Sequence, residues 1–381
     1  MGSYAEDYSY ESFNLLNITE TMGNGDPAHH EHEEFYMMCQ FITGLILYPI
    51  ICFPGLIGNI LTLVVLSKTN MRNSTNAFLS ALAVSDSIKM LNDILYFSVI
   101  LMLKTDPETA NKLFGYIYPY AHFIFNMSGC VSAWLTVSVA VERYILVCHA
   151  PKARTMCNRS RAILTSSLVF VVMTGVALPS LWRYRTITVL DTDTNRTVFD
   201  IKLTDLWEKK DKLTMYYTWV MNFFRCNIPC VVLVIMNTCI ITAVWKTRAN
   251  KRSNSRQKIT FMMIIVILVF TICITPDAIM STFLGFGYGE EDYLVKGIRE
   301  FTDTLLALNA AVNFVIYCVF SHKFRQNFNE TFCGRRPYKR QTKENVDPFY
   351  RRLSDQSNNN VYAFIPLNFN GWIEPDLDKE I

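Results

Sequence analysis

Hydrophobic residues along this chain gather into seven long stretches that short polar segments separate. Five of these stretches contain no Asp, Glu, Lys or Arg, and they cover residues 35–67, 113–141, 162–182, 259–276 and 304–322. Two others, near 75–103 and 213–245, are interrupted by Asp86, Lys89, Asp93 and Arg225. Because a helix needs about 20 mostly apolar residues to cross a bilayer core, the pattern predicts seven transmembrane helices. The expected fold class is an all-α membrane protein, a seven-transmembrane helix bundle with a short amphipathic eighth helix.

Composition agrees with this interpretation and indicates the domain organisation. The chain is 51% hydrophobic and 18% charged, whereas ordinary soluble domains are about 25% charged. We expect an extracellular acidic N-terminal tail over 1–36, the transmembrane domain over 37–321, an amphipathic helix at the membrane over 322–333, and a cytoplasmic, disordered tail over 334–381. No apolar region with a cleavage site opens the chain, so the first span is expected to serve as its own signal anchor.

The distribution of Lys and Arg predicts the orientation in the membrane. The first basic residue is Lys68, whereas residues 246–258 carry six basic side chains and no acidic one. Since Lys- and Arg-rich loops stay in the cytoplasm, the N-terminus is expected outside the plasma membrane and the C-terminus inside. Asn17 and Asn195 then lie in extracellular Asn-X-Thr triplets and are glycosylation candidates. The basic residues are spread over short loops, which argues against nucleic acid as a partner.

The eleven cysteines do not predict a disulfide framework. Most lie within the predicted spans, where cysteine behaves as a small apolar residue, and only Cys39 lies near the outer surface. Cys333 follows the predicted amphipathic helix, a position that suits reversible acylation beside the lipid bilayer. A free thiol at Cys333 fits the sequence equally well.

Several short motifs occur in order along the spans. They are Gly58-Asn59, Leu82-Ala83-Val84-Ser85-Asp86, Trp134, Glu142-Arg143-Tyr144, the run from Tyr144 to Thr155, Pro229, Phe270, Pro276, Asn313-Phe314-Val315-Ile316-Tyr317 and Phe324-Arg325-Gln326-Asn327-Phe328. Through them the chain resembles the rhodopsin-like (class A) G protein-coupled receptors, and more narrowly the invertebrate neuropeptide receptors for FMRFamide-type and myoinhibitory or sex-peptide ligands. The resemblance implies a receptor for an extracellular peptide that signals through a heterotrimeric G protein, with receptor kinases and arrestin as further partners. It implies no catalytic activity.

The same resemblance implies a conformational switch on the cytoplasmic side. Its residues would be Glu142, Arg143, Tyr144, Pro229, Phe270, Asn313 and Tyr317. On activation Arg143 would leave Glu142 and line the pocket for the terminal helix of the G protein. Some positions depart from the family pattern, namely Tyr118, Asn237, Arg256, Ile274 and Phe314. Arg256 cannot supply the usual acidic lock, and Tyr118 replaces the cysteine that bridges to the second outer loop, which itself has no cysteine.

Asp86 is an ionisable residue at membrane depth, where such residues normally line the bundle interior. The resemblance implies a hydrated sodium site formed by Asp86, Ser132, Asn309 and Asn313, all of which carry the oxygen that a hard cation prefers. A sodium ion would act there as an allosteric modulator, and no cofactor is required. The alternative is a polar network that holds the helices together through hydrogen bonds.

The resemblance also bears on the ligand, because Phe125 occupies the position at which amine receptors carry aspartate. A biogenic amine is therefore disfavoured. The outer halves of the spans carry acidic and aromatic candidates for ligand contact: Asp93, Asp277, Glu300, Asp303, Tyr96, Tyr120, Phe123, Trp219 and Phe283. Arginine pairs with carboxylates through a fork of hydrogen bonds and stacks on rings, so these groups suit an Arg-Phe-amide peptide end. Asp303 and Glu300 are the preferred partners of that arginine.

Arg225 and Asp277 are expected to face each other across spans five and six. Such a buried pair either neutralises itself inside the bundle or contacts the ligand, and the sequence leaves both open. A Trp-amide myoinhibitory-type peptide is the alternative ligand, which would use the aromatic wall more than the acids.

Other function classes fit less well. A membrane transporter, the remote alternative, would show paired repeats and broken helices at mid-membrane, and a channel would need pore-lining rings or filter loops. A retinal-binding pigment would need a lysine in the seventh span, and none lies between Lys296 and Lys323. No nucleophile elbow, phosphate loop or metal-ligand spacing supports an enzyme.

Overall fold

A computed structural model describes residues 27–191, 196–208, 212–248, 254–283 and 293–334. The chain divides into two compact units, Met1–Arg325 and Gln326–Ile381. The first unit contains the long helices of the described residues.

The first span is one continuous helix in three parts: α1 (Pro27–Gln40), a π-helical segment (Phe41–Leu47) and α2 (Tyr48–Leu66). A short 3₁₀ turn (Thr69–Met71) leads to α3 (Ser74–Leu103), and α4 (Pro107–Cys148) follows. The short helix α5 (Ala150–Met156) precedes α6 (Arg159–Ala177), which ends in a 3₁₀ segment (Leu178–Trp182).

The second half begins with a hairpin of β1 (Tyr184–Asp191) and β2 (Arg196–Leu203), followed by the single turn α7 (Asp205–Glu208). The fifth span consists of α8 (Lys212–Asn222), a second π-helical segment (Phe223–Asn227) and α9 (Ile228–Arg248). The chain continues with α10 (Asn254–Phe283), α11 (Tyr293–Phe320) and the short α12 (His322–Phe332).

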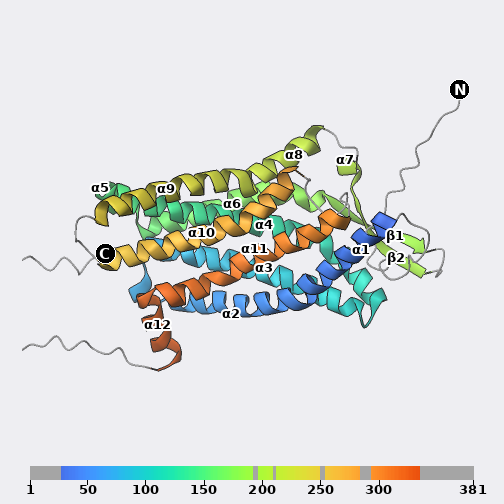
Figure 1. Ribbon diagram of the computed structural model, residues 1–381, viewed down its shortest axis with the longest axis horizontal. Helices are drawn as coiled ribbons and strands as arrows, with labels where there is room; N and C mark the ends of the chain where they lie inside the picture. Colours follow the sequence, from blue (N-terminus) through green and yellow to red (C-terminus); the bar gives the residue numbers. More distant parts are fainter. Residues whose placement is uncertain (1–26, 192–195, 209–211, 249–253, 284–292, 335–381) are drawn as a thin grey trace, which may run out of the picture. The chain divides into compact units, whose positions relative to one another are not determined.

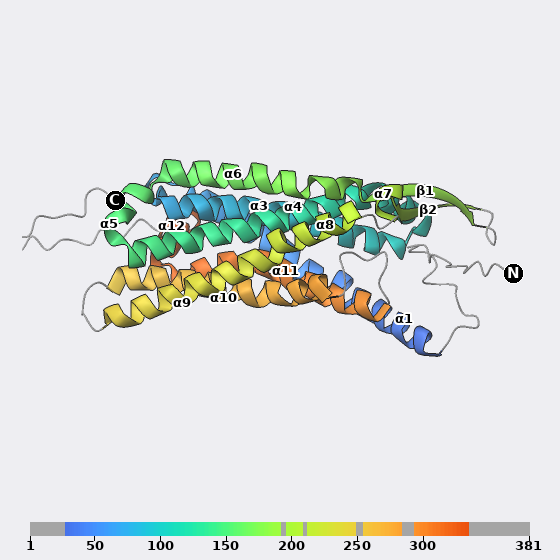
Figure 2. The same cartoon turned by 90° about the horizontal axis from the view of Figure 1, so that it is seen from above.

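Six helical segments of the described chain are long and apolar enough to cross a membrane: His32–Leu66, Pro107–Cys148, Arg159–Trp182, Lys212–Ala243, Ile264–Thr282 and Tyr293–Phe320. The seventh long helix, α3, has 30 residues and contains Asp86, Lys89 and Asp93, all of them buried. It packs against α2, α4, α6 and α11 (Figure 1), and α6 lies along α3 and α4 (Figure 2). The charged helix is thus enclosed by its neighbours, and the predicted seven-transmembrane bundle is confirmed.

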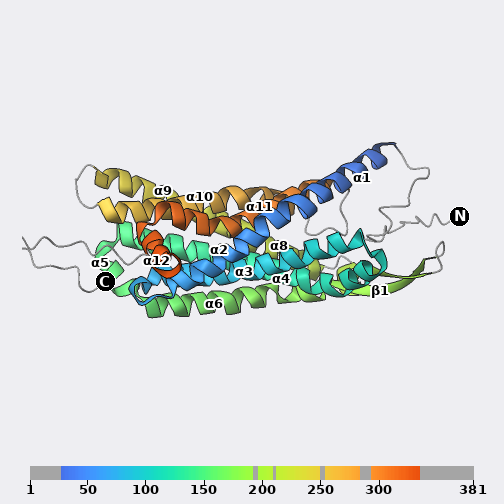
Figure 3. The same cartoon turned by 90° about the horizontal axis from the view of Figure 1, so that it is seen from below.

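Two helices begin earlier than hydropathy predicts. α1 begins at Pro27, whereas the sequence predicts a tail that continues to residue 36; it packs against α11 (Figure 3), with Tyr36 buried. α4 begins at Pro107 because the Asp106 carboxylate accepts a hydrogen bond of 3.1 Å from the amide of Thr109 and caps the helix. The side-chain and backbone hydrogen bonds of Thr109 hold the pKa of Asp106 below its ordinary value.

The β-hairpin is an element that the all-α prediction lacks. Its strands pair antiparallel, from Tyr184 opposite Leu203 to Asp191 opposite Arg196. Both strands are rich in β-branched residues, which suit an extended backbone. The end of the bundle that carries β1 and β2 is called the hairpin end below, and the end that carries α5 is called the α5 end.

The hairpin is anchored on α4 by packing. The ring of Tyr118 lies 5.1 Å from that of Tyr184 in an edge-to-face arrangement, and the Thr186 hydroxyl donates a hydrogen bond of 2.5 Å to the carbonyl of Gly115. All eleven cysteines lie among the described residues, and every one is free. Tyr118, which stands where the resembling receptors have a bridging cysteine, therefore contributes a ring contact to the same loop.

Helices α2 and α11 approach each other closely because α2 presents glycines at the contact. A Cβ atom added to Gly55 would lie 2.7 Å from the Cβ of Ala311, and one added to Gly58 would lie 2.9 Å from the Cβ of Phe314. Both distances are too short for real carbon atoms. Phe314, which stands where the resembling receptors have proline, thus packs into a notch that Gly58 leaves open.

Replacing Gly55 by alanine is expected to destabilise the protein by about 1–3 kcal/mol, the usual effect of overpacking a core. The new methyl group would also meet the Cα of Ala311 at 3.1 Å, so the backbone of α11 has to move. The measurement is the midpoint of thermal unfolding of the purified protein in detergent.

Gly175→Ala in α6 is the matched control, because nothing lies within 4 Å of a Cβ atom at that position. Alanine there is expected to be neutral or slightly stabilising, since it favours the helix. Equal unfolding midpoints for the two variants would contradict the close approach of α2 and α11.

Candidate functional site

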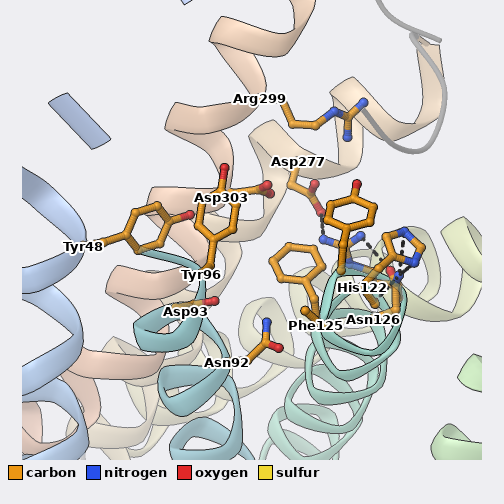
Figure 4. A pocket seen from close by; sticks show the side chains of 13 residues that line it. Tyr48, Asn92, Asp93, Tyr96, His122, Phe125, Asn126, Asp277, Arg299 and Asp303 are labelled. Atoms are coloured by element: carbon orange, nitrogen blue, oxygen red, sulfur yellow. Dashed lines mark hydrogen bonds and ion pairs between the residues drawn. The ribbon is translucent and has the colours of Figure 1, made fainter. Parts of the chain in front are cut away.

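A cavity lies at the hairpin end among α2, α3, α4, α10, α11 and the segment Phe223–Asn227. The empty space at this site, open solvent at the mouth included, is about 820 Å³. We call it the outer cavity. Its lining residues, shown in Figure 4, are Tyr48, Asn92, Asp93, Tyr96, Tyr118, Ala121, His122, Phe125, Asn126, Arg225, Asp277, Arg299 and Asp303.

Two buried ion pairs lie at the wall of the outer cavity. Arg225 Nη2 is 2.9 Å from Asp277 Oδ2, which is the pair expected from the sequence. Lys89 Nζ is 2.6 Å from Asp93 Oδ2, four residues further along α3. The Phe125 ring faces both cations, with its centroid 4.8 Å from the Arg225 guanidinium and 5.0 Å from the Lys89 ammonium. Because a ring face attracts cations, Phe125 links the two pairs.

The Arg225–Asp277 pair has further hydrogen-bond partners. Arg225 Nη1 donates a hydrogen bond of 3.3 Å to Asn126 Oδ1, and the Ser281 hydroxyl donates one of 3.4 Å to Asp277 Oδ1. A buried pair requires such partners because its charges have left water. The pair thus neutralises itself inside the bundle while both of its residues also line the outer cavity.

Asp303 and Arg299 bring two more charges to the outer cavity. They lie one turn apart on α11, and both are buried. Asp303 lines the outer cavity together with the rings of Tyr96 and Tyr48 (Figure 4). The outer cavity therefore contains a carboxylate beside aromatic rings, and it also contains guanidinium groups.

Four predicted ligand contacts do not line the outer cavity. Glu300 accepts hydrogen bonds from Thr43 at 3.1 Å and from Tyr96 at 3.3 Å, so it joins the first span to α11. Tyr120 and Trp219 are 62% and 44% exposed and face away from the bundle interior. Phe123 is half-buried on a different face of α4. A fifth candidate, Phe283, has a side chain that lies outside the described residues.

Six residues of the outer cavity are absent from the prediction made from sequence: Tyr48, Asn92, Ala121, His122, Asn126 and Arg299. Helical spacing could have found several of them. Tyr118, His122 and Phe125 recur at intervals of four and three residues on one face of α4, and Arg299 precedes Asp303 by four. Arg299 and Lys89 alter the expected electrostatics most, because the wall is charge-balanced where an acidic wall was expected.

A smaller cavity of about 380 Å³, the inner cavity, lies among α3, α4, α10, α11 and Arg225. Asp86 at its wall accepts a hydrogen bond of 3.1 Å from Ser132 Oγ and one of 2.9 Å from Asn313 Nδ2. Asn309 also lines this cavity. The four residues predicted for a sodium site are therefore brought together.

The charges around the inner cavity fit a sodium ion poorly. Asp86 is the only acid among the lining residues, whereas Lys89 and Arg225 both line the same space. In the described part of the chain, no group of three or more His, Cys, Asp or Glu residues could hold a metal ion. A free cation in this cavity would be attracted by the Asp86 carboxylate and repelled by the Lys89 and Arg225 cations, each of which is paired with another acid.

At the α5 end, Thr75 of α3 holds the Glu142-Arg143 pair of α4. The Thr75 hydroxyl donates a hydrogen bond of 2.7 Å to Glu142 Oε2 and accepts one from Arg143 Nη2. The direct distance from Arg143 Nη2 to Glu142 Oε2 is 3.9 Å, and all three residues are buried. Arg143 is thus held against α3 through a hydroxyl group. The side chain of Arg256, which faces this position in the family pattern, lies outside the described residues.

The other predicted switch residues occupy the core and the α5 end. Phe270 is buried in an apolar cluster with Ile274, and Pro229 is buried at the start of α9. Tyr144 lies at the α5 end, with its hydroxyl 3.3 Å from His149 Nε2. The Tyr317 hydroxyl is buried without a hydrogen-bond partner among the described residues. An unsatisfied buried group costs about 1–3 kcal/mol, so Tyr317 gains from any rearrangement that supplies a partner.

A family model described as 7 transmembrane receptor (rhodopsin family) matches residues 58–317, which is more than half of the chain. The chain belongs to this receptor family. The receptor is therefore a multi-pass membrane protein and not an enzyme.

Individual relatives show which receptors the chain is similar to. The receptor is 26% identical to the FMRFamide receptor of Drosophila melanogaster over 302 residues, which cover 76% of this chain and 54% of that relative. It is 28% identical to the sex peptide receptor of Drosophila melanogaster, covering 75% of this chain and 72% of the relative. It is 26% identical to the RYamide receptor of Tribolium castaneum, covering 74% and 78%. The chain thus spans about half the length of the FMRFamide receptor, and the relatives that it is similar to are named as receptors for peptides.

The structure describes only one of the three predicted modification sites, Cys333. Asn17 and Asn195 lie outside the described residues. Cys333, just past α12, is exposed and free, so its acylation stays a prediction.

Replacing Thr75 by valine is expected to raise the receptor's basal signalling. The change removes the hydroxyl that holds Arg143 to α3, and one hydrogen bond contributes about 1 kcal/mol. A change of that size shifts an equilibrium roughly fivefold, here toward conformations with a released Arg143. Basal second-messenger output, normalised to surface expression, is the measurement.

Thr238→Val is the matched control for this substitution. Thr238 is an exposed residue of α9 whose hydroxyl bonds only to the carbonyl of Val234 in its own helix, at 2.8 Å. Its removal is expected to leave basal signalling unchanged. Unchanged output in both variants would show that Thr75 does not restrain the receptor.

Proposed function

We propose that this receptor lies in the plasma membrane with its hairpin end outside, binds a short amidated neuropeptide of the Arg-Phe-amide type, and signals through a heterotrimeric G protein at its α5 end. The observation that carries the proposal is the outer cavity, where a buried carboxylate stands beside tyrosine rings in a rhodopsin-family bundle. The orientation rests on the Lys- and Arg-rich loop at 246–258, which favours the cytoplasm.

The names of two relatives support a peptide of this type. FMRFamide and RYamide both denote an arginine followed by an aromatic residue and an amide. Such an end presents a guanidinium, a ring and a neutral amide within two residues. A cavity that accepts it needs a carboxylate, an aromatic surface and hydrogen-bond donors, and the outer cavity has all three.

Asp303 is the carboxylate that we assign to the peptide arginine. It lines the outer cavity together with Tyr96 and Tyr48 (Figure 4), so a guanidinium in the cavity can pair with the carboxylate while its face contacts a ring. Asp93 and Asp277 lie in the same cavity, at 2.6 Å from Lys89 and 2.9 Å from Arg225.

Arg299 is the candidate donor for the amide end of the peptide. Its guanidinium lines the outer cavity one turn from Asp303, and guanidinium groups donate up to five hydrogen bonds. A neutral amide carbonyl can accept from Arg299 without disturbing the ion pairs nearby.

Activation requires the peptide to bind the open conformation better than the closed one. In the structure, Arg143 is held by Thr75 and Glu142, and we take this arrangement as the closed conformation. We propose that release of Arg143 opens the α5 end to the G protein. Receptor kinases and arrestin would then act on the cytoplasmic residues after 333, in keeping with the family.

The test is a second-messenger screen, for both calcium and cyclic AMP, in cells that express the receptor. The panel contains FMRFamide, an Arg-Tyr-amide peptide, and Trp-amide myoinhibitory peptides, because the sex peptide receptor is among the similar proteins. A strong response confined to the Arg-containing peptides is expected. A response to the Trp-amide peptides alone would replace the proposed ligand class, and silence with verified surface expression would refute the peptide assignment.

Asp303→Asn is expected to weaken FMRFamide roughly 10- to 100-fold, since a charge-assisted hydrogen bond contributes about 1.5–3 kcal/mol. The change keeps the size of the side chain and removes its charge. The measurement is the concentration of FMRFamide that gives half of the maximal response, at matched surface expression.

Asp205→Asn is the matched control. Asp205 pairs with Arg185 at 2.7 Å near the hairpin, and both side chains are largely exposed, so its removal tests the general effect of losing one acidic group there. Its potency shift is expected to be less than about threefold, because exposed pairs contribute little. Unchanged potency in Asp303→Asn would remove Asp303 from the ligand site.

A further inference from the structure

Lys89 lies on α3 between two carboxylates of the same helix. Asp86 precedes it by three residues and Asp93 follows it by four. Residues three and four apart share one face of a helix, so a single ammonium group can reach either carboxylate. All three side chains are buried, at a depth where an ionised group needs a partner.

In the structure Lys89 is bound to Asp93, at 2.6 Å, with its ammonium also over the ring of Phe125. Asp86 instead accepts its two hydrogen bonds from Ser132 and Asn313. The two carboxylates therefore have different partners: Asp93 is in contact with a cation, and Asp86 accepts hydrogen bonds from neutral donors.

The same lysine also joins the two cavities. Asp93 lines the outer cavity, Asp86 and Lys89 line the inner cavity, and Phe125 and Arg225 line both. Arg225, whose guanidinium also lies 4.8 Å from the centroid of the Phe125 ring, is bound to Asp277 at 2.9 Å. Lys89 is thus the cation whose helical neighbours are the two acids of α3.

We propose that Lys89 is a tethered counter-ion that Asp93 and Asp86 share, and that its ammonium takes the place of a sodium ion at Asp86. The long stem of lysine is flexible, and its ammonium has three donors that adapt to either carboxylate. A tethered cation does not lose translational freedom on binding, whereas an ion from solution does. Once Lys89 is present, a second cation in the inner cavity is also repelled by it.

Because Asp93 and Asp86 share Lys89, binding in the outer cavity can change the hydrogen bonds of Asp86 in the inner cavity. A second ligand cation that occupies Asp93, beside the arginine assigned to Asp303, would free the Lys89 ammonium to turn toward Asp86. Asp86 accepts from Asn313 of α11, so the hydrogen bonds between α3 and α11 would change in response. This consequence rests on the proposed function, whereas the tethered counter-ion itself does not.

The experiment uses thermal unfolding of the purified full-length receptor without any peptide, so its outcome is independent of the ligand. Unfolding midpoints are compared in NaCl and in choline chloride at about 0.15 M ionic strength. For the unmodified receptor the two midpoints are expected to agree within about 1 °C, because sodium has no site to bind.

The decisive variant combines Lys89→Met with Asp93→Asn. It removes one positive and one negative charge together, so the net charge of the bundle is unchanged, and it leaves Asp86 with its oxygen-bearing neighbours but without the shared ammonium. This double variant is expected to gain about 3 °C or more in NaCl relative to choline chloride, with saturation as sodium is raised. Adding Asp86→Asn to the double variant is expected to abolish the gain.

Lys89→Arg is the conservative control, since it keeps a cation at the position and is expected to stay insensitive to sodium. Saturable, sodium-specific stabilisation of the unmodified receptor would overturn the proposal. A double variant that folds but gains nothing from sodium would overturn it too, because Lys89 would then not be what excludes the ion.

Discussion

An ionised side chain inside a bilayer has to find its counter-charge within the protein, and much of this structure follows from that constraint. Three ion pairs are buried in the bundle: Lys89 with Asp93, Arg225 with Asp277, and Arg143 with Glu142. The Arg225–Asp277 pair joins the fifth span to α10, and Thr75 of α3 joins the Glu142–Arg143 pair of α4, so these contacts require their helices to face one another in one rotational setting. The apolar surfaces of these helices tolerate several settings, because lipid is as apolar as the core. The polar contacts between helices therefore specify the register that the hydrophobic residues leave open.

Helix α3 carries most of the polar groups that link the two ends of the bundle. Thr75 lies at the α5 end, Asp86 and Lys89 lie at the inner cavity, and Asp93 lies at the outer cavity. This helix is the one long helix of the described chain that is too polar to qualify as a span by itself. Its neighbours α2, α4, α6 and α11 supply the apolar cover that it lacks. Because polar groups lie along the whole of α3, a changed contact at one end of this helix can alter the hydrogen bonds that it makes further along.

The sequence predicts the helices well and the cavity only in part, and the difference has physical causes. Hydropathy locates the spans, and the Arg225–Asp277 pair and the neighbours of Asp86 follow from the family pattern. Hydropathy does not detect the start of α1 at Pro27, because those turns are polar and are supported by contact with α11. It also says nothing of rotation, so Tyr120 and Trp219 were assigned to the cavity although their helical phase turns them outward. In the sequence Lys89 looks like an interruption of a span. Only its spacing of four residues from Asp93 indicates that it is the partner of a buried acid.

The hairpin is attached to the bundle by ring contacts, by the hydroxyl of Thr186 and by packing of Tyr184 and Ile201 against α3 and α4, with no disulfide. Segments that are held by a few contacts open locally with a free energy below that of global unfolding. The attachment of this hairpin therefore depends on the strength of contacts such as that between Tyr118 and Tyr184. The redox state of the surroundings leaves it unchanged, because every cysteine of the chain is free and no disulfide is there to be reduced.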